Sequence, residues 1–143
     1  YLDKLNKRIA SVLSGAALAT ETAEKMLPFC LPFDEMNVNR TAEEMVARIM
    51  TGLGIRVSAP DLSKSASSDM GNVSFSCPAV QAELALSDHS FPLHTEEMVR
   101  TVQNPAVIGP VSLGAKVISH TLLYLMSHAE TMAAIRQDFL QNR

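Results

Sequence analysis

The chain has 143 residues, the length of one ordinary domain, and 47% of them are hydrophobic, which is enough to build a core. The net charge is −3 and the 12 basic residues are scattered, so the composition argues against binding to nucleic acid or to an anionic membrane surface. No apolar run approaches the roughly 18 residues that span a bilayer, and no basic segment followed by an apolar one indicates a signal peptide.

The first part of the chain predicts a helix and then an extended segment. Apolar residues recur at helical spacing with basic residues between them, which predicts an amphipathic helix over 2–18. Residues 20–33 contain Pro28 and Pro32, which a central strand excludes, so we expect an edge strand that runs into a linker. The chain also begins without Met and already in helical pattern, as expected for a segment of a longer protein.

A second helix and a short strand follow. Thr41 to Glu44 matches the Ser/Thr-x-x-Glu capping box and opens a predicted helix over 41–53. Residues 55–58 have the composition of a short strand, and the Ser- and Asp-rich stretch over 61–68 predicts a loop.

The last part of the chain predicts one strand and two helices. Residues 80–86 alternate apolar and polar side chains, which is typical of a strand with one covered face. Pro110 suits the first turn of a helix over 110–126, whose wide apolar face predicts burial on several sides. Ser127 to Glu130 matches a second capping box and starts a terminal helix.

The order of these elements favours an α/β fold in which helices cover a sheet. We place a boundary near residues 36–39, which separates 1–36 from 37–143. Few strands are available, and an isolated helix with one edge strand leaves its apolar face wet. We therefore expect each of the two parts to lack some of the elements that would cover its apolar faces.

Cys30 and Cys77 are far apart and outside any Cys-x-x-Cys pair. This usage is typical of free, buried thiols in a reducing compartment, so a cytoplasmic location is expected, although a single disulfide also fits. Cys77 has no basic neighbour in the sequence and predicts an inert thiol. No nucleophile elbow and no phosphate-binding loop is present, and no catalytic residue is assigned.

The stretch Ser-Ser-Asp-Met-Gly-Asn-Val-Ser over 67–74 has two interpretations. As a turn or helix start, Ser68 and Asp69 bond to nearby backbone amides while Gly71 permits a tight backbone. As a substrate-facing loop, the same polar side chains and backbone N–H groups meet a ligand at the end of a strand.

The four histidines are His89, His94, His120 and His128. His94 stands in Leu-His-Thr, where a neutral imidazole can bind a metal, but no His-x-x-x-His, His-x-His or Cys-x-x-Cys accompanies it. Its partner ligands would have to come from elsewhere. We expect His120 to be a core or boundary histidine and His128 to be exposed, and the sequence assigns His89 no partner.

Residues 67–74, followed by Cys-Pro, a predicted strand and His-Thr at 94–95, resemble the C-terminal part of the metal-dependent amidohydrolases of peptidase family M-twenty. The resemblance is to the branch of aminobenzoyl-glutamate hydrolases and aminoacylase-like dipeptidases. Residues 16–20 resemble the end of that family's last lid helix, 37–54 the helix that re-enters its catalytic domain, and 110–143 its closing helices.

The resemblance implies a zinc-exopeptidase-like α/β catalytic domain with an inserted lid and dimerisation domain. Residues 1–36 would be the last helix and strand of the lid, and 37–143 the second half of the catalytic domain. It also implies two divalent metal ions, zinc or manganese, that activate a water to attack an amide carbonyl, with a glutamate as general base.

The resemblance assigns roles to individual residues. His94 occupies the position of a metal ligand near the family's C-terminus, and Ser68, Asp69 and Asn72 fall in its substrate-side loop. The family's earlier ligand motifs, such as Cys-Gly-His-Asp, and its lid histidine are missing here. The implied enzyme therefore needs a longer chain, and these residues alone are expected to be inactive.

Two functions follow from this reading. The first is the C-terminal portion of a homo-oligomeric metal-dependent amidohydrolase that cleaves N-acyl amino acids or dipeptide-like amides. The alternative is a non-catalytic segment that acts as an oligomerising or partner-binding module. Neither involves nucleic acid or a membrane.

Overall fold

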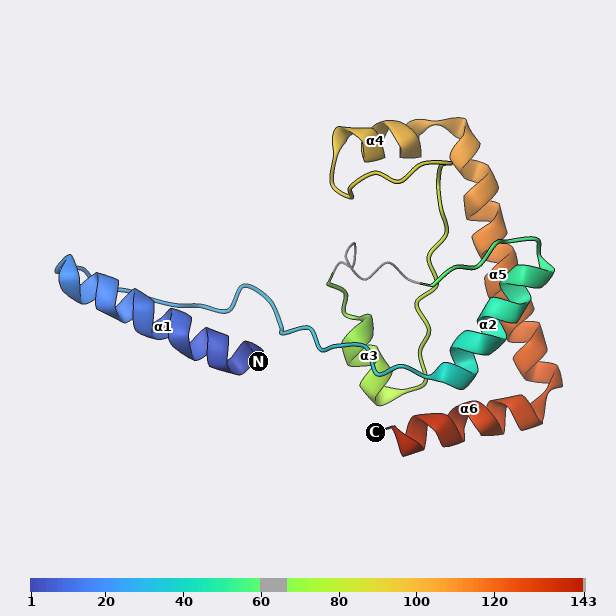
Figure 1. The fold of residues 1–143 in the computed structure, drawn as a ribbon, viewed down its shortest axis with the longest axis horizontal. Helices are drawn as coiled ribbons and strands as arrows, with labels where there is room; N and C mark the ends of the chain where they lie inside the picture. The colour runs from blue at the N-terminus through green and yellow to red at the C-terminus, as the bar shows by residue number, and fades with distance from the viewer. Residues whose placement is uncertain (60–66, 143) are drawn as a thin grey trace. The chain divides into compact units, whose positions relative to one another are not determined.

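The computed structural model describes residues 1–59 and 67–142 (Figure 1). The chain divides into two compact units, Tyr1–Pro32 and Phe33–Arg143. The domain boundary expected near residues 36–39 stays a prediction. Most of the loop predicted over 61–68 lies outside the described residues.

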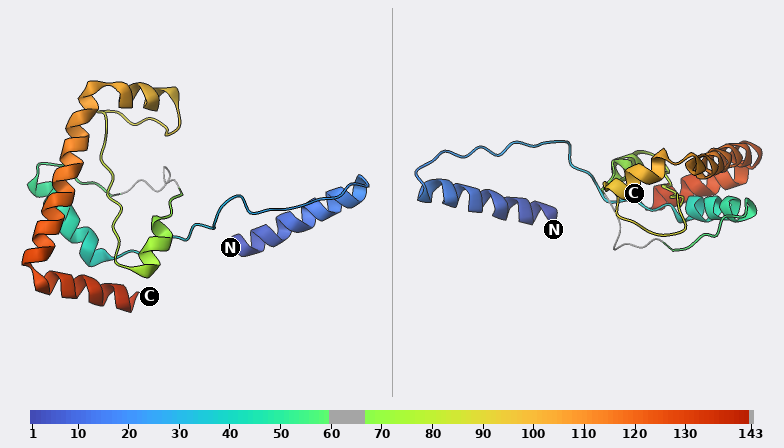
Figure 2. Two further views of the ribbon diagram at one scale, coloured as in Figure 1. Left: turned by 180° about the vertical axis from the view of Figure 1, so that it is seen from behind. Right: turned by 90° about the horizontal axis from the view of Figure 1, so that it is seen from above.

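The first unit consists of α1 (Leu2–Ala19) and an irregular segment after it. The helix predicted over 2–18 is thereby confirmed, although none of its side chains is buried. The edge strand predicted over 20–33 is wrong: this segment is irregular and runs back alongside α1 (Figure 2), where Ser14 Oγ donates to Glu24 Oε1 at 2.9 Å. A strand needs a neighbour for its backbone groups, and this unit offers only a helix.

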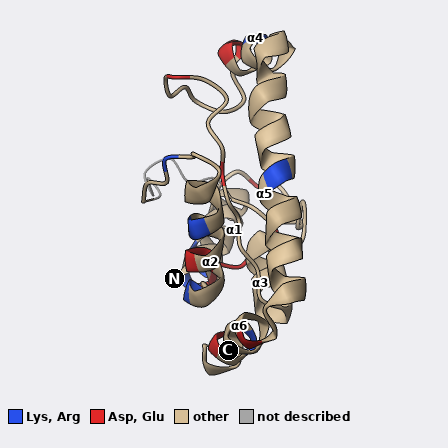
Figure 3. Cartoon of the chain, turned by 90° about the vertical axis from the view of Figure 1, so that its right-hand side faces the viewer, with Lys and Arg blue, Asp and Glu red and all other residues tan. Residues whose placement is uncertain are grey.

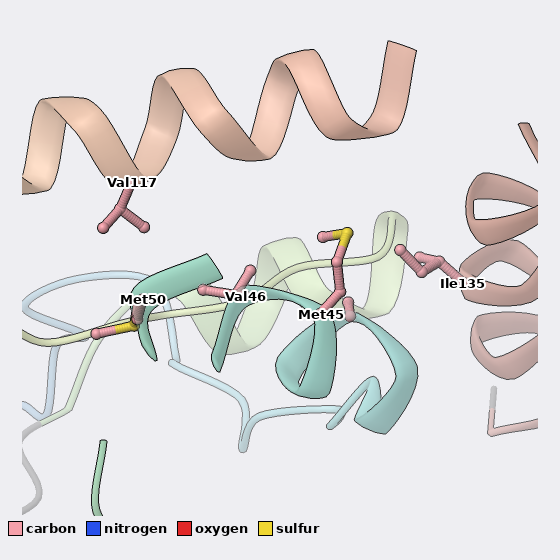
Figure 4. Packing of buried hydrophobic residues seen from close by; sticks show 6 residues of the cluster. Met45, Val46, Met50, Val117 and Ile135 are labelled. Atoms are coloured by element: carbon pink, nitrogen blue, oxygen red, sulfur yellow. The ribbon is translucent and has the colours of Figure 1, made fainter. Parts of the chain in front are cut away.

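The helices of the second unit are α2 (Arg40–Gly52), α3 (Met70–Ser76), α4 (Glu96–Gln103), α5 (Ile108–Ser127) and α6 (Ala129–Gln141), with the 3-10 turn η2 (Pro105–Val107) before α5. Its hydrophobic core lies where α2, α5 and α6 meet. Figure 4 shows side chains from these helices around that point: Met45, Val46 and Met50 from α2, Val117 from α5 and Ile135 from α6.

The predicted α/β fold is wrong for the part of the chain that the structure describes, which contains helices and no strand. Residues 55–58 and 80–86 are both irregular and join no ladder. Val80 and Leu84 are half-buried against the core, whereas Gln81 and Glu83 are exposed. The alternating pattern therefore reflects one face covered by helices, and side-chain alternation carries no information about whether the backbone is paired.

The helix predicted over 110–126 is confirmed as α5, which begins two residues earlier at Ile108. Its expected burial on several sides is wrong, because Val117 is its only buried side chain. Lys116 is its only charged residue, so α5 is nearly uncharged in Figure 3. By length and composition alone, Pro105–Ser127 could cross a membrane, a test that core helices also pass. The absence of a membrane segment stays a prediction.

The capping residues of two helices differ from those expected. Asn39, not Thr41, caps α2, and its Oδ1 accepts a hydrogen bond from the Ala42 backbone N–H at 2.9 Å. The second capping box is also wrong, since the Ser127 hydroxyl donates back to the Leu123 carbonyl of its own helix at 2.7 Å. The terminal helix itself is confirmed as α6.

Asn39 also joins two helices that are distant in the sequence. Its side chain is 2% exposed, and Nδ2 donates to the Ile135 carbonyl on α6 at 2.9 Å. Beside it, the Thr41 backbone N–H donates to Asp138 Oδ2 at 2.9 Å, which lowers the pKa of the Asp138 carboxyl. The start of α2 is therefore fixed on α6 by two hydrogen bonds.

We expect Asn39→Ala to lower the free energy of unfolding by about 2–4 kcal/mol, because it removes a helix cap and leaves a buried carbonyl without its donor. Urea denaturation followed by circular dichroism measures this. The control is Asn104→Ala at the exposed cap of η2, where Asn104 Oδ1 accepts from the Ala106 N–H, and the loss there should be about 1 kcal/mol or less. Equal losses in the two variants would contradict the role given to Asn39.

Candidate functional site

The Ser-Ser-Asp-Met-Gly-Asn stretch starts a helix. Ser68 Oγ accepts a hydrogen bond from the Met70 backbone N–H at 3.2 Å, as expected for a turn that leads into α3. Asp69 stands at the N-cap position, yet its side chain makes no capping hydrogen bond and is exposed. The backbone of this stretch therefore forms a helix start, as the first interpretation predicts. The Asp69 carboxylate plays no part in it and remains accessible to a ligand.

The following residues bind the segment 34–37. Ser74 is fully buried; its Oγ accepts from the Asn37 backbone N–H at 2.8 Å and donates to the Gly71 carbonyl at 2.6 Å. Asn72 Nδ2 donates to Asp34 Oδ2 at 2.9 Å. A Cβ atom added to Gly71 would overlap the Asp34 carbonyl. Packing against 34–37 thus explains three residues of the motif.

Asp34 was not identified from the sequence, although it is the partner of a candidate substrate residue. The Asn72 carboxamide also accepts from the Asp34 backbone N–H at 3.4 Å, so both ends of this amide face Asp34. The only available signal was a carboxylate just after a proline-containing segment. That signal does not reveal a contact 38 positions away in the chain.

His94 lies in the loop before α4 and has an unusual backbone conformation. Its φ is 61°, in the left-handed region that non-glycine residues seldom occupy. Thr95 follows as the N-cap of α4, where its Oγ1 accepts from the Met98 N–H at 3.3 Å and donates to the Pro92 carbonyl at 2.9 Å. The His94 side chain is exposed at this sharp turn.

His89 closes the loop that carries His94. Its Nδ1 lies 2.9 Å from Asp88 Oδ1 and its Nε2 lies 2.9 Å from Glu97 Oε1, at the start of α4. Hydrogen bonding to Asp88 first, and then to Glu97, raises the pKa of His89, while the bond from His89 lowers the pKa of Asp88. The sequence assigned His89 no partner, and the adjacent Asp-His pair was the signal for one of the two.

The other two histidines have structural partners. His120 is exposed and its Nδ1 donates to the Lys116 carbonyl at 2.8 Å, so the expectation of a core or boundary residue is wrong. His128 is half-buried rather than exposed, and it stacks on Tyr124 with ring centroids 3.9 Å apart. Its Nδ1 also donates to the Tyr124 carbonyl at 2.9 Å.

The candidate metal ligand and the candidate substrate residues belong to different elements of the fold. Ser68, Asp69 and Asn72 lie together at the start of α3, whereas His94 belongs to the loop before α4. Within residues 1–59 and 67–142, no group of three or more His, Cys, Asp or Glu side chains could hold a metal ion. Since catalytic zinc sites use about three protein ligands, these residues alone do not fit the metal pair that the resemblance implies.

An apolar groove of about 1150 Å³ lies between α2, α5, α6 and residues 76–82. It contains none of the four candidate site residues. Cys77 lines it and is exposed, as is Cys30, and both thiols are free. The prediction of free thiols is confirmed and the prediction of buried ones is wrong.

Comparisons with protein-family models, curated proteins and solved structures give no match for this chain. The resemblance to the M-twenty amidohydrolases therefore rests on the sequence motifs alone.

We expect Gly71→Ala to destabilise the second unit by about 2 kcal/mol or more, since the new Cβ forces α3 away from the Asp34 carbonyl. Thermal unfolding measures the loss, and the amide resonance of Asn37 reports the broken contact. Gly52→Ala in α2 is the control, because open space surrounds Gly52 and alanine favours a helix by up to about 1 kcal/mol. Destabilisation of both variants alike would contradict the close approach.

We expect an NMR titration to give His89 a pKa above 6.5, the ordinary value. A raised folded-state pKa means that the stabilisation is fully present below pH 6.5 and is lost as the pH rises through the folded value. Glu97→Ala should lower the pKa of His89. Glu96→Ala, whose carboxylate pairs with Arg100 instead, should leave it unchanged, and equal effects would disprove the bridge.

Proposed function

We propose that this chain is the C-terminal portion of a metal-dependent amidohydrolase that acts on N-acyl amino acids or dipeptide-like amides. The observation that carries the proposal is the Ser-Ser-Asp-Met-Gly-Asn-Val-Ser motif over 67–74 followed by His-Thr at 94–95. We extend the proposal to a cytoplasmic homo-oligomer that binds a small amide or peptide substrate.

Accessible polar groups support these assignments. The His94 imidazole is exposed and makes no hydrogen bond or ion pair with another described residue, so both ring nitrogens are open to a ligand. The Asp69 carboxylate is likewise exposed and is not used for capping. His94 would supply one metal ligand, and the rest of the ligand set would come from residues outside 1–143.

Ser68, Asp69 and Asn72 would contact the substrate. The hydrogen bonds between Asn72 and Asp34 hold this amide in one orientation before a substrate arrives. Such preorganisation lowers the entropy lost on binding.

We expect no amidase activity from the 143 residues alone, because a single histidine does not hold a catalytic metal. In the protein encoded by the full reading frame, His94→Ala should lower hydrolysis of an N-acyl amino acid by more than about 100-fold, since even residues that only support metal ligands cost 10–100-fold. His128→Ala, which removes a ring stacked on Tyr124, should retain most of the activity.

Two results would count against these assignments. Metal-dependent turnover by the 143-residue chain that is lost on chelation would contradict the expectation that the other ligands lie outside it. An equal loss of activity in the His94 and His128 variants, or activity of the full reading frame that chelation leaves unchanged, would overturn the proposed metal chemistry at His94. Both assays compare the same substrate with and without added zinc or manganese.

A second candidate function is that of a partner-binding module. It is favoured by the apolar groove and by the exposed side chains of α5, among which Leu122 and Leu123 are 57% and 65% exposed. Exposed apolar area of this kind marks interaction surfaces in soluble proteins.

A further inference from the structure

Residues 79–86 form an irregular segment whose backbone pairs with no other residue that the structure describes. Within the described part of the chain, no hydrogen bond is made by the backbone N–H or C=O groups of this segment. Figure 1 shows it leaving the end of α3 as an open trace that runs toward α4. Its N–H and C=O groups are therefore available to pair with an added strand, as at the edge of a sheet.

The apolar groove lies directly beside this segment. Val80, Gln81 and Ala82 line one side of it, and α2, α5 and α6 line the other. Paired strands lie about 4.8 Å apart, and their side chains alternate between two faces. A strand placed next to residues 80–82, the part of this segment that lines the groove, would therefore direct alternate side chains into it.

We propose that this groove binds an extended polypeptide strand that pairs with the backbone of residues 79–86 and fills the groove with alternate apolar side chains. This inference rests on the partner-binding candidate and not on the amidohydrolase proposal. Main-chain hydrogen bonds would supply affinity, and the groove would select apolar residues at every second position. A helix or a small apolar molecule would fill the groove and leave the backbone of 79–86 unpaired.

The strand comes from a different sequence rather than from a second copy of this segment. If residues 80–86 of two copies paired as antiparallel strands over their full length, with the apolar faces on the same side, Glu83 of one copy would lie opposite Glu83 of the other. Like charges directly opposite one another destabilise a strand pair. The partner strand therefore carries no acidic side chain at the position opposite Glu83.

The test uses a capped peptide, Lys-Thr-Val-Thr-Val-Thr-Val-Lys, and the same peptide with its internal amides N-methylated. Fluorescence anisotropy measures binding to the 143-residue chain, and hydrogen exchange reports the site. We expect the parent peptide to slow exchange of the amides in 79–86 by at least about tenfold. The methylated peptide keeps every side chain but has lost its internal donors, so it should not bind.

Two neighbouring leucines of α5 supply the matched variants. Leu122 lines the groove and Leu123 does not, and both are exposed, so neither substitution removes a core residue. Leu122→Asp should weaken peptide binding by at least about tenfold, because covering a carboxylate with the apolar side chains of the peptide removes it from water. Leu123→Asp should bind the peptide as the parent chain does.

Several outcomes would overturn the inference: equal affinity for the two peptides, equal effects of the two aspartate variants, or protection confined to residues outside 79–86. A dimer by light scattering whose 79–86 amides are protected without peptide would show that a second copy is the occupant, which also contradicts it. Hydrolase activity of the full reading frame is measured separately, so either proposal can fail alone.

Discussion

One stretch of chain, residues 34–41, holds the second unit together. Its first half binds α3 through Asn72 and Ser74, and its second half binds α6 through the buried amide of Asn39. The partners are 37 or 38 positions away in the first case and 96 in the second. Because α2 begins inside this stretch, these hydrogen bonds fix the direction of its first turn.

The dependence runs from this stretch to the core. Met45, Val46 and Met50 of α2 share one core cluster with Val117 and Ile135, and α2 starts from the stretch that is bonded to α6. The same stretch explains why residues 67–74, which have the composition of a loop, lead into α3. The start of α3 packs against residues 34–37. At Gly71, α3 approaches the Asp34 carbonyl so closely that a side chain does not fit there.

Helices were predictable because their periodicity arises within a few turns of the chain itself. The helices over 2–18, 41–53 and 110–126 all followed from spacing of this kind. Strands were not predictable from the sequence, because the pairing of a strand depends on a distant segment. In residues 80–86 the alternation was real, but helices cover its apolar face and the backbone has no partner in the described chain. The cap of α2 was missed because an upstream asparagine competes with the predicted threonine.

The candidate site was predictable in part. The turn or helix start, one of the two interpretations of residues 67–74, is found at Ser68. His94 stays a predicted metal ligand, and its side chain is exposed. Sequence reasoning missed the bridge from His89 to Glu97, since adjacency in the sequence suggests only the Asp88 half. It also missed Asp34, whose contact with Asn72 forms only when the chain folds.

Each unit carries one exposed free thiol, Cys30 in the first and Cys77 in the second. Cysteine is otherwise absent, so the native chain can be labelled once per unit without introducing or removing a residue. A pair of spin labels or fluorophores on these sulfurs would report the separation of the two units in solution. Because Cys77 also lines the groove, the same label would register the arrival of a molecule there.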